Sequence, residues 1–209
     1  MKLKVLNIEG KPTSKSVDLS DSIYGVEPND HAIYLAVKQF RANNRAGTHK
    51  SKERAEIAGS TRKIKKQKGT GTARAGSIKS PLFKGGGRVF GPRPHKYDFK
   101  LNKKLKDVAR KSALSYKAKD ESIVVVEDFN LDTPKSKEFK RILKNIGAEG
   151  KKSVVLISDK NDNVYLSSRN IPGTKVSLAV GLNTYEIMDA QVLILTEGSV
   201  TKIDEILNN

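Results

Sequence analysis

Glycine and lysine occur together between positions 66 and 79, and this is the combination that phosphate-binding loops use. In a loop of the G-x-x-x-x-G-K-[ST] type, backbone N–H groups hold the phosphates and the lysine contacts them directly. Gly71 and Gly76 have the required separation, but Ser77 and Ile78 stand where the lysine and the serine or threonine are needed. The pattern therefore does not predict a nucleotide site of this type.

A dinucleotide-binding fingerprint also fails in this segment. Gly69 and Gly71 begin the pattern G-x-G-x-x-G, but Arg74 occupies the third glycine position and no strand directly precedes it. The chain has no G-x-S-x-G elbow, no H-E-x-x-H pair and no obvious pair of catalytic carboxylates. An enzyme on a nucleotide-binding α/β scaffold stays the alternative, but it would need an unfamiliar site. We therefore predict no catalytic residues.

Metal and thiol chemistry have few candidate residues. The chain has no cysteine, which excludes disulfides, thiolate zinc sites and cysteine nucleophiles. His31, His49 and His95 share no metal-ligand spacing, so we interpret them as surface or packing residues. We expect no metal and no cofactor.

Positive charge is the strongest chemical signal in the sequence. The 209 residues carry 40 Lys and Arg against 23 Asp and Glu, a formal net charge of +17. The 64 residues from Arg41 to Lys104 hold 19 of these cations and three acids, whereas the other 145 residues are nearly neutral. This division indicates an ordinary globular body that carries one segment for binding a polyanion.

The basic segment from Gly47 to about Tyr97 is also poor in core residues. Only four large aliphatic residues precede Val89, and nine of the chain's 16 glycines lie between positions 47 and 91. Alone, such a segment is expected to be disordered and to order on a partner. Because cations neutralise phosphates and glycine lets backbone N–H groups approach them, the predicted partner is nucleic acid.

The length of this segment favours RNA over DNA. If it doubles back, each arm of about 25 residues could span roughly 80 Å at about 3.3 Å per residue, which suits a large folded RNA. A DNA-compacting protein is a third possibility that the charge permits. Against it, the cations lie in one internal loop rather than in a tail or a recognition helix.

Outside the basic segment, the hydrophobic pattern alternates between strands and helices. The predicted strands are an opening alternation in Leu3, Val5 and Ile8 and the apolar runs Ile123–Val126, Val154–Ile157, Val176–Val180 and Gln191–Leu195. The predicted helices have apolar stripes at Ile33, Val37 and Phe40; at Leu101, Leu105, Val108, Ser112 and Tyr116; from Thr133-Pro134 through Phe139, Ile142, Leu143 and Ile146 to Gly147; near Tyr165; and from Ser199 through Val200, Ile203 and Leu207.

This alternation predicts an α/β fold, a three-layer sandwich with a mainly parallel central sheet. A long extended basic loop is inserted between the first two predicted helices. We assign residues 1–46 and 98–209 to the globular body and residues 47–97 to the loop, as one domain with an insertion. No apolar run approaches the roughly 20 residues of a membrane span, so we expect a soluble, cytoplasmic protein without a membrane partner.

Three runs in the basic segment carry a family resemblance. They are Lys66-Gln67-Lys68-Gly69-Thr70-Gly71, then Ala73-Arg74-Ala75-Gly76-Ser77-Ile78-Lys79-Ser80-Pro81, then Gly85-Gly86-Gly87 with Phe90-Gly91-Pro92. With them, the chain resembles ribosomal large-subunit protein four, the uL-four family, in its shorter bacterial form. The resemblance covers essentially the whole chain.

The resemblance implies a structural role in the large ribosomal subunit and localisation in the ribosome, in the cytoplasm. It implies binding to the large-subunit (23S) ribosomal RNA and support of early subunit assembly. It also implies a loop tip at the wall of the nascent-peptide exit tunnel, near the site of macrolide antibiotics. The implied partners are 23S ribosomal RNA, neighbouring large-subunit ribosomal proteins and the nascent peptide.

The charge pattern and the resemblance together give the candidate site residues. Those assigned to ribosomal RNA binding are Arg41, Arg45, Lys50, Lys52, Arg62, Lys63, Lys65, Lys66, Gln67, Lys68, Gly69, Thr70, Gly71, Arg74, Ser77, Lys79, Lys84, Gly85, Gly86, Gly87, Arg88, Arg93, Lys96, Lys103 and Lys104. Those assigned to the tunnel-side tip are Lys65, Lys66, Gln67, Lys68, Gly69, Thr70, Gly71 and Thr72, with Lys68 as its most important cation.

The tip departs from the family pattern in two places. A Pro-Trp pair is common in the family just before this stretch, and arginine is common after the second glycine, whereas this chain has Ile64-Lys65 and Thr72. One phosphate contact is therefore missing at the tip, and an aromatic contact with a base is not expected there. Because many cation contacts add up, we expect RNA binding to survive.

Four aromatic residues near the loop root, Phe83, Phe90, Tyr97 and Phe99, have two interpretations. They could stack on bases, or they could pack in a small local cluster. We favour packing and assign none of them as a stacking platform.

Overall fold

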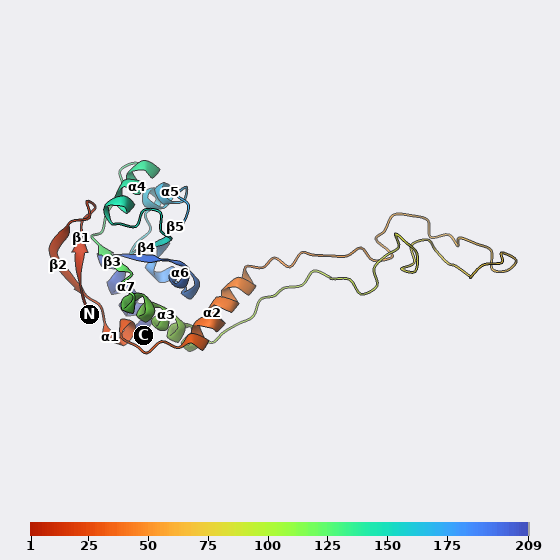
Figure 1. The fold of residues 1–209 in the computed structure, drawn as a ribbon, viewed down its shortest axis with the longest axis horizontal. Coiled ribbons are helices and arrows are strands. Elements are labelled where there is room, and N and C mark those ends of the chain that lie inside the picture. Colours follow the sequence, from red (N-terminus) through yellow and green to blue (C-terminus); the bar gives the residue numbers. More distant parts are fainter. Residues whose placement is uncertain (209) are drawn as a thin grey trace. The chain divides into compact units, whose positions relative to one another are not determined.

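Short apolar runs form the centre of a six-stranded sheet in the computed structural model, which describes residues 1–208 (Figure 1). The spatial order of the strands is β2-β1-β3-β6-β4-β5. All neighbours are parallel except β1 and β2, which pair antiparallel. The bounds are β1 Lys2–Leu6, β2 Pro12–Asp18, β3 Ile123–Val126, β4 Ser153–Ile157, β5 Thr174–Leu178 and β6 Val192–Thr196.

Helices connect the parallel strands. Their bounds are α1 Asp21–Tyr24, α2 Asp30–Asn43, α3 Lys103–Lys119, α4 Ser136–Asn145, α5 Asp162–Ser168, α6 Thr184–Asp189 and α7 Glu197–Asn208, with one 3₁₀ turn, η1, at Ala179–Gly181. The α/β class and the mainly parallel sheet predicted from the hydrophobic pattern are thus confirmed.

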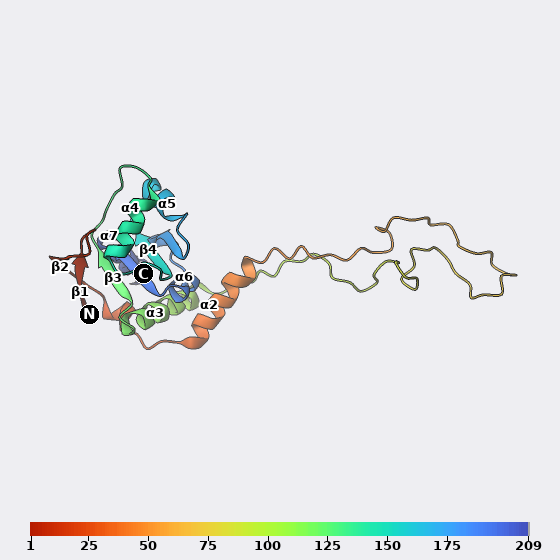
Figure 2. The same cartoon turned by 45° about the horizontal axis from the view of Figure 1, so that its top comes forward.

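The central strands β3, β4 and β6 are buried on both faces of the sheet, to which their consecutive side chains point in turn. Leu193 and Leu195 of β6 belong to one apolar cluster and Ile194 to the other. The first cluster draws its helical residues from α1, α3, α6 and α7, and the second from α4 and α5. Figure 2 shows α4 and α5 on the side of the sheet opposite to α3.

The buried face of α3 differs from its predicted face. The prediction placed Val108 inward, but its side chain is 44% exposed. Most of the buried residues of α3 are small: Ala109, Ser112 and Ala113 are 0% exposed, and Leu114 is the large apolar residue buried with them. The predicted stripe was right at Ser112 and wrong at Val108, and it omitted the two alanines and Leu114 that pack against the core.

Three elements had no counterpart in the prediction. The edge strand β2 is polar and largely exposed, so it has no clear apolar alternation. The helices α1 and α6 have four and six residues, too few for a periodic stripe. The basic segment consequently follows the second helix of the chain rather than the first.

The chain divides into two compact units. One consists of Met1–Arg41 and the part from Lys100 onward, and the other is Ala42–Phe99. Beyond the end of α2, the second unit contains turns and bends and one isolated antiparallel bridge, between Lys63 and Ser77.

Candidate nucleic-acid interface

Backbone hydrogen bonds join the two arms of the Ala42–Phe99 unit. The amide of Ser51 donates to the carbonyl of Pro92 at 3.0 Å, and the amide of Arg88 donates to the carbonyl of Lys52 at 3.0 Å. Within this unit the arms run antiparallel along their length (Figure 1). Such bonds fix the register of the arms and therefore the positions of their side chains.

Two glycines permit this close approach of the arms, and a third permits a tight turn within the returning arm. A Cβ atom at Gly87 would lie 2.4 Å from the backbone nitrogen of Arg54, and one at Gly91 would lie 2.4 Å from the Cβ of Ser51. At Gly86 the added atom would lie 1.9 Å from the carbonyl oxygen of Ser80. Gly86 and Gly87, which the sequence assigned to RNA binding, therefore face the chain's own backbone.

The other candidate glycines have open surroundings. No heavy atom lies within 4 Å of the Cβ position at Gly69, Gly71 or Gly85. Gly69 and Gly71 adopt φ values of +80° and +61°, which favour glycine over other residues. Their backbone is free for the approach of a phosphate.

The tip of the unit is closed by a short antiparallel contact. The amide of Ile64 donates to the carbonyl of Gly76 at 3.0 Å. The Ser77 side chain is buried, and its hydroxyl donates to the carbonyl of Ser60 at 3.1 Å. Ser77, another candidate for RNA binding, thus already has a partner within the loop.

Two lysines, one in the tip and one just before it, donate hydrogen bonds to polar side chains of the tip. Lys65 Nζ donates to Thr72 Oγ1 at 2.8 Å, and Lys63 donates to the Gln67 side chain. Thr72 is the position at which the resemblance leads us to expect arginine. Its side chain carries no charge, and it accepts a hydrogen bond from Lys65.

Aromatic rings pack at the root of the unit. The His95 and Tyr97 rings have centroids 4.3 Å apart, and the Arg45 guanidinium lies 3.9 Å from the centroid of Tyr97. This arrangement agrees with the packing interpretation for Tyr97. Phe90, by contrast, is 100% exposed.

Few acids neutralise the cations of this unit, which has fifteen Lys and Arg against three Asp and Glu. Glu56 pairs with Lys50, and Glu53 pairs with Arg93. The hydrogen bond from Lys50 holds the pKa of the Glu56 carboxyl below its usual value. Among the described residues, the cations of this unit with neither an ion pair nor a side-chain hydrogen bond are Arg45, Lys52, Arg54, Arg62, Lys66, Lys68, Arg74, Lys79, Lys84, Arg88 and Lys96.

The candidates of the other unit are exposed on two helices. Arg41 lies in the last turn of α2, and Lys103 and Lys104 lie in the first turn of α3. The amino end of a helix carries partial positive charge, and the first turn of α3 has no acid to offset the two lysines. Their placement is unfavourable for the helix alone and favourable for contact with an anion.

The sequence assignment omitted Arg54. Its side chain is exposed and has no ion-pair partner among residues 1–208, and it belongs to the same basic unit as the selected cations. The positive charge of Arg54 within the basic segment could have led to its selection from the sequence.

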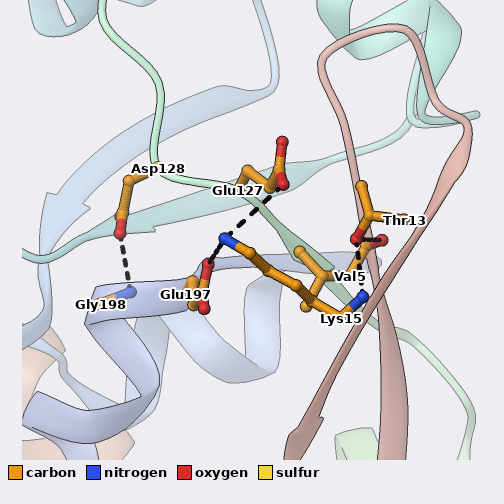
Figure 3. Close-up of polar contacts among 7 residues, drawn as sticks. All are labelled: Val5, Thr13, Lys15, Glu127, Asp128, Glu197 and Gly198. Carbon is orange, nitrogen blue, oxygen red and sulfur yellow. Dashed lines mark hydrogen bonds and ion pairs between the residues drawn. The ribbon is translucent and has the colours of Figure 1, made fainter.

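At the carboxyl edge of the sheet, where α/β proteins commonly bind ligands, charged groups pair with one another. Figure 3 shows Lys15 Nζ between Glu127, at 3.8 Å, and Glu197, at 3.3 Å. Asp128 accepts a hydrogen bond from the amide of Gly198 at 3.1 Å. These contacts join β2, the segment after β3 and the start of α7.

The described part of the chain has neither a metal-binding cluster nor a membrane-spanning helix. Residues 1–208 contain no group of three or more His, Asp or Glu placed to hold a metal ion. Over the same residues, no helix combines the length and the apolar character needed to cross a membrane.

Comparison with known proteins gives matches over the whole chain. The profile of the ribosomal protein L4/L1 family matches residues 17–206. A protein of Christiangramia forsetii, named large ribosomal subunit protein uL4, is 61% identical over 100% of both chains. Proteins of the same name are 59% identical in Bacteroides fragilis, over 99% of this chain and 100% of the relative, and 55% identical in Amoebophilus asiaticus, over 100% of both.

Proposed function

This chain belongs to the ribosomal protein L4/L1 family, and from that premise we propose that it is a structural component of the large ribosomal subunit that binds 23S ribosomal RNA. Its relatives are named as large-subunit proteins and match it from end to end. The observation that carries the RNA-binding part is the two-armed unit Ala42–Phe99, whose cations are mostly unpaired.

We further propose the role of each part of the chain. The body, a three-layer α/β sandwich of residues 1–46 and 98–209, docks on RNA through cations of α2 and α3. Residues 47–97 form an extended basic loop that threads into the RNA, and its tip, Lys65 to Thr72, lines the nascent-peptide exit tunnel. The exposed cations and open glycines at Gly69 and Gly71 support this assignment.

The proposal includes the remaining partners and the cellular role. The protein supports early assembly of the subunit in the cytoplasm, beside neighbouring large-subunit proteins and the nascent peptide, and it is not an enzyme. The pairing of charged groups at the carboxyl edge of the sheet fits a role without catalysis.

Sedimentation of a tagged chain from a bacterial lysate tests this function. We expect the chain to remain on the large subunit after a high-salt wash, because loose electrostatic association falls steeply with salt. A soluble peak free of RNA would refute the ribosomal role.

A pair of charge variants tests the assignment of the interface. We expect replacement of Lys66, Lys68 and Arg74 by Gln to weaken retention. The control removes the same three charges from the body, at Lys137, Lys144 and Lys151, all exposed and without ion pairs among residues 1–208. Equal losses in both variants would mean that net charge alone, and not the loop, determines binding.

A further inference from the structure

We propose that Phe90 stacks on an unpaired base of the RNA and so anchors the root of the loop. The inference rests on the proposed function and adds to it a contact that is not electrostatic. The carrying observation is exposure, because the Phe90 side chain is 100% exposed while Phe83 and Tyr97 in the same unit are half-buried. Packing within the chain therefore does not account for this ring.

The backbone around Phe90 is held at both ends. The amide of Arg88 bonds to Lys52, and the carbonyl of Pro92 bonds to Ser51, each at 3.0 Å. Between these two anchor points the chain bends outward at Val89 and Phe90, and Val89 is 57% exposed.

Close contacts of two glycines keep this bend in place. Gly87 lies against the backbone of Arg54, and Gly91 lies against the Ser51 side chain, so that neither leaves room for a Cβ atom. The ring of Phe90 is thus presented on a fixed bend, and less conformational entropy is lost when it binds.

The charge around the ring identifies its partner. Arg88, which has no ion pair among residues 1–208, lies two residues from Phe90, in a unit with fifteen cations and three acids. An apolar pocket of another protein would have to accommodate these charges, whereas RNA supplies phosphates for the cations and a flat base for the ring. Single-stranded and bulged bases stack on aromatic side chains in this way.

A tryptophan at this position would report the contact directly, because the chain has no tryptophan of its own. The full-length Phe90→Trp variant is titrated with a 23S ribosomal RNA transcript free of protein. We expect RNA affinity close to wild type and strong quenching of the indole fluorescence by the stacked base. A Tyr165→Trp variant, with its tryptophan on the exposed surface of α5, controls for quenching that does not depend on position.

Substitutions without an aromatic ring complete the test. We expect Phe90→Leu and Phe90→Ala to weaken RNA binding about 5- to 100-fold. The dependence of the binding constant on salt should stay at its wild-type slope, because no phosphate contact is lost. Since the ring is fully exposed, thermal unfolding of both variants should match wild type.

The outcomes separate this inference from the proposed function. Wild-type binding together with full binding by Phe90→Leu and an unquenched Phe90→Trp would overturn the stacking contact. A Phe90→Trp signal that changes only when ribosomal proteins are added would also overturn it, in favour of a protein pocket. Failure of the wild-type chain to bind the transcript would instead overturn the proposed function.

Discussion

At the scale of single residues, the glycines of the basic unit divide into two groups. Gly87 and Gly91 have no room for a Cβ atom because the opposite arm lies against them, and Gly86 has none because the carbonyl of Ser80 in its own arm lies there. Gly69 and Gly76 have no heavy atom within 4 Å of the Cβ position. Composition alone treats these glycines as equivalent, but substitutions should distinguish them.

Alanine at Gly87 and at Gly76 should therefore have different effects. We expect Gly87→Ala to force the arms apart and to speed deuterium exchange at the amide of Arg88 in the free protein. Gly76 has no positive φ, so Gly76→Ala should leave that exchange unchanged and weaken RNA binding if a phosphate approaches its backbone. Fast exchange at Arg88 in the wild-type chain would mean that the arms order only on RNA.

A half-buried acid on α7, Asp204, has a separate consequence for stability. Asp204 Oδ1 and the hydroxyl of Tyr24 are shielded from solvent, and neither has a hydrogen-bond partner within residues 1–208. Burial raises the pKa of the Asp204 carboxyl, and burial together with the Asp204 charge raises the pKa of Tyr24. The ionised carboxylate thus costs stability at neutral pH.

We expect Asp204→Asn to stabilise the protein at pH 7 by about 1 kcal/mol. A raised pKa means that the native state binds the proton more tightly, so the cost develops as the pH rises through the folded pKa. The gain should accordingly shrink toward zero as the pH falls below the carboxyl's ordinary value of 3.8. Urea unfolding at pH 7 and at low pH measures both points, and a gain independent of pH would contradict the electrostatic cause.

At the scale of elements, strong apolar periodicity was sufficient to predict a helix or strand, and weak periodicity was not. The fully apolar run Ile123–Val126 forms β3. The apolar stripe through Phe139 forms α4, which ends at Asn145, two residues before Gly147. The edge strand β2 was not predicted, because most of its side chains are polar and exposed and so give no apolar alternation. The strand order could not be predicted, because periodicity does not specify which strands are neighbours.

The α3 face offers a stability test of the corrected packing. Ala113 is 0% exposed in the core cluster, so Ala113→Leu should overpack it and cost about 1 to 3 kcal/mol. Val108→Ala, on the exposed face, should cost less than about 0.5 kcal/mol. Urea unfolding gives both values, and the reverse order would restore the face predicted from the large apolar residues.

At the scale of the whole molecule, charge and glycine content in the sequence indicate a basic segment but not which of its residues face outward. Charge counting and glycine content placed it between Gly47 and Tyr97, close to the observed unit Ala42–Phe99. Which residues face outward depends on contacts between the arms, such as Gly87 with Arg54, that are distant in sequence. Ser77, which was expected to contact RNA, is consequently buried, and Phe90, which was expected to pack in the chain, is exposed.

The division into a body and a basic unit predicts that the loop tip can be removed without unfolding the body. Replacement of Ile64–Gly76 by Asn-Gly would join Lys63 to Ser77, the bridged pair, through a two-residue hairpin turn. We expect unchanged urea unfolding of the body, whose core clusters contain no residue of this segment.

RNA binding by the same variant should weaken in a way that salt reveals. The removed segment contains four cations, Lys65, Lys66, Lys68 and Arg74. Each phosphate contact contributes about 0.7 to 0.9 to the slope of log K against log salt, so the slope should decrease by about 3 to 4 if all four touch phosphate. An unchanged slope would place the tip away from the RNA backbone, and loss of cooperative unfolding would make the tip part of the fold. Because Phe90 is retained, the quenching of Phe90→Trp in this shortened chain should persist, which separates the anchor at the root from the charges at the tip.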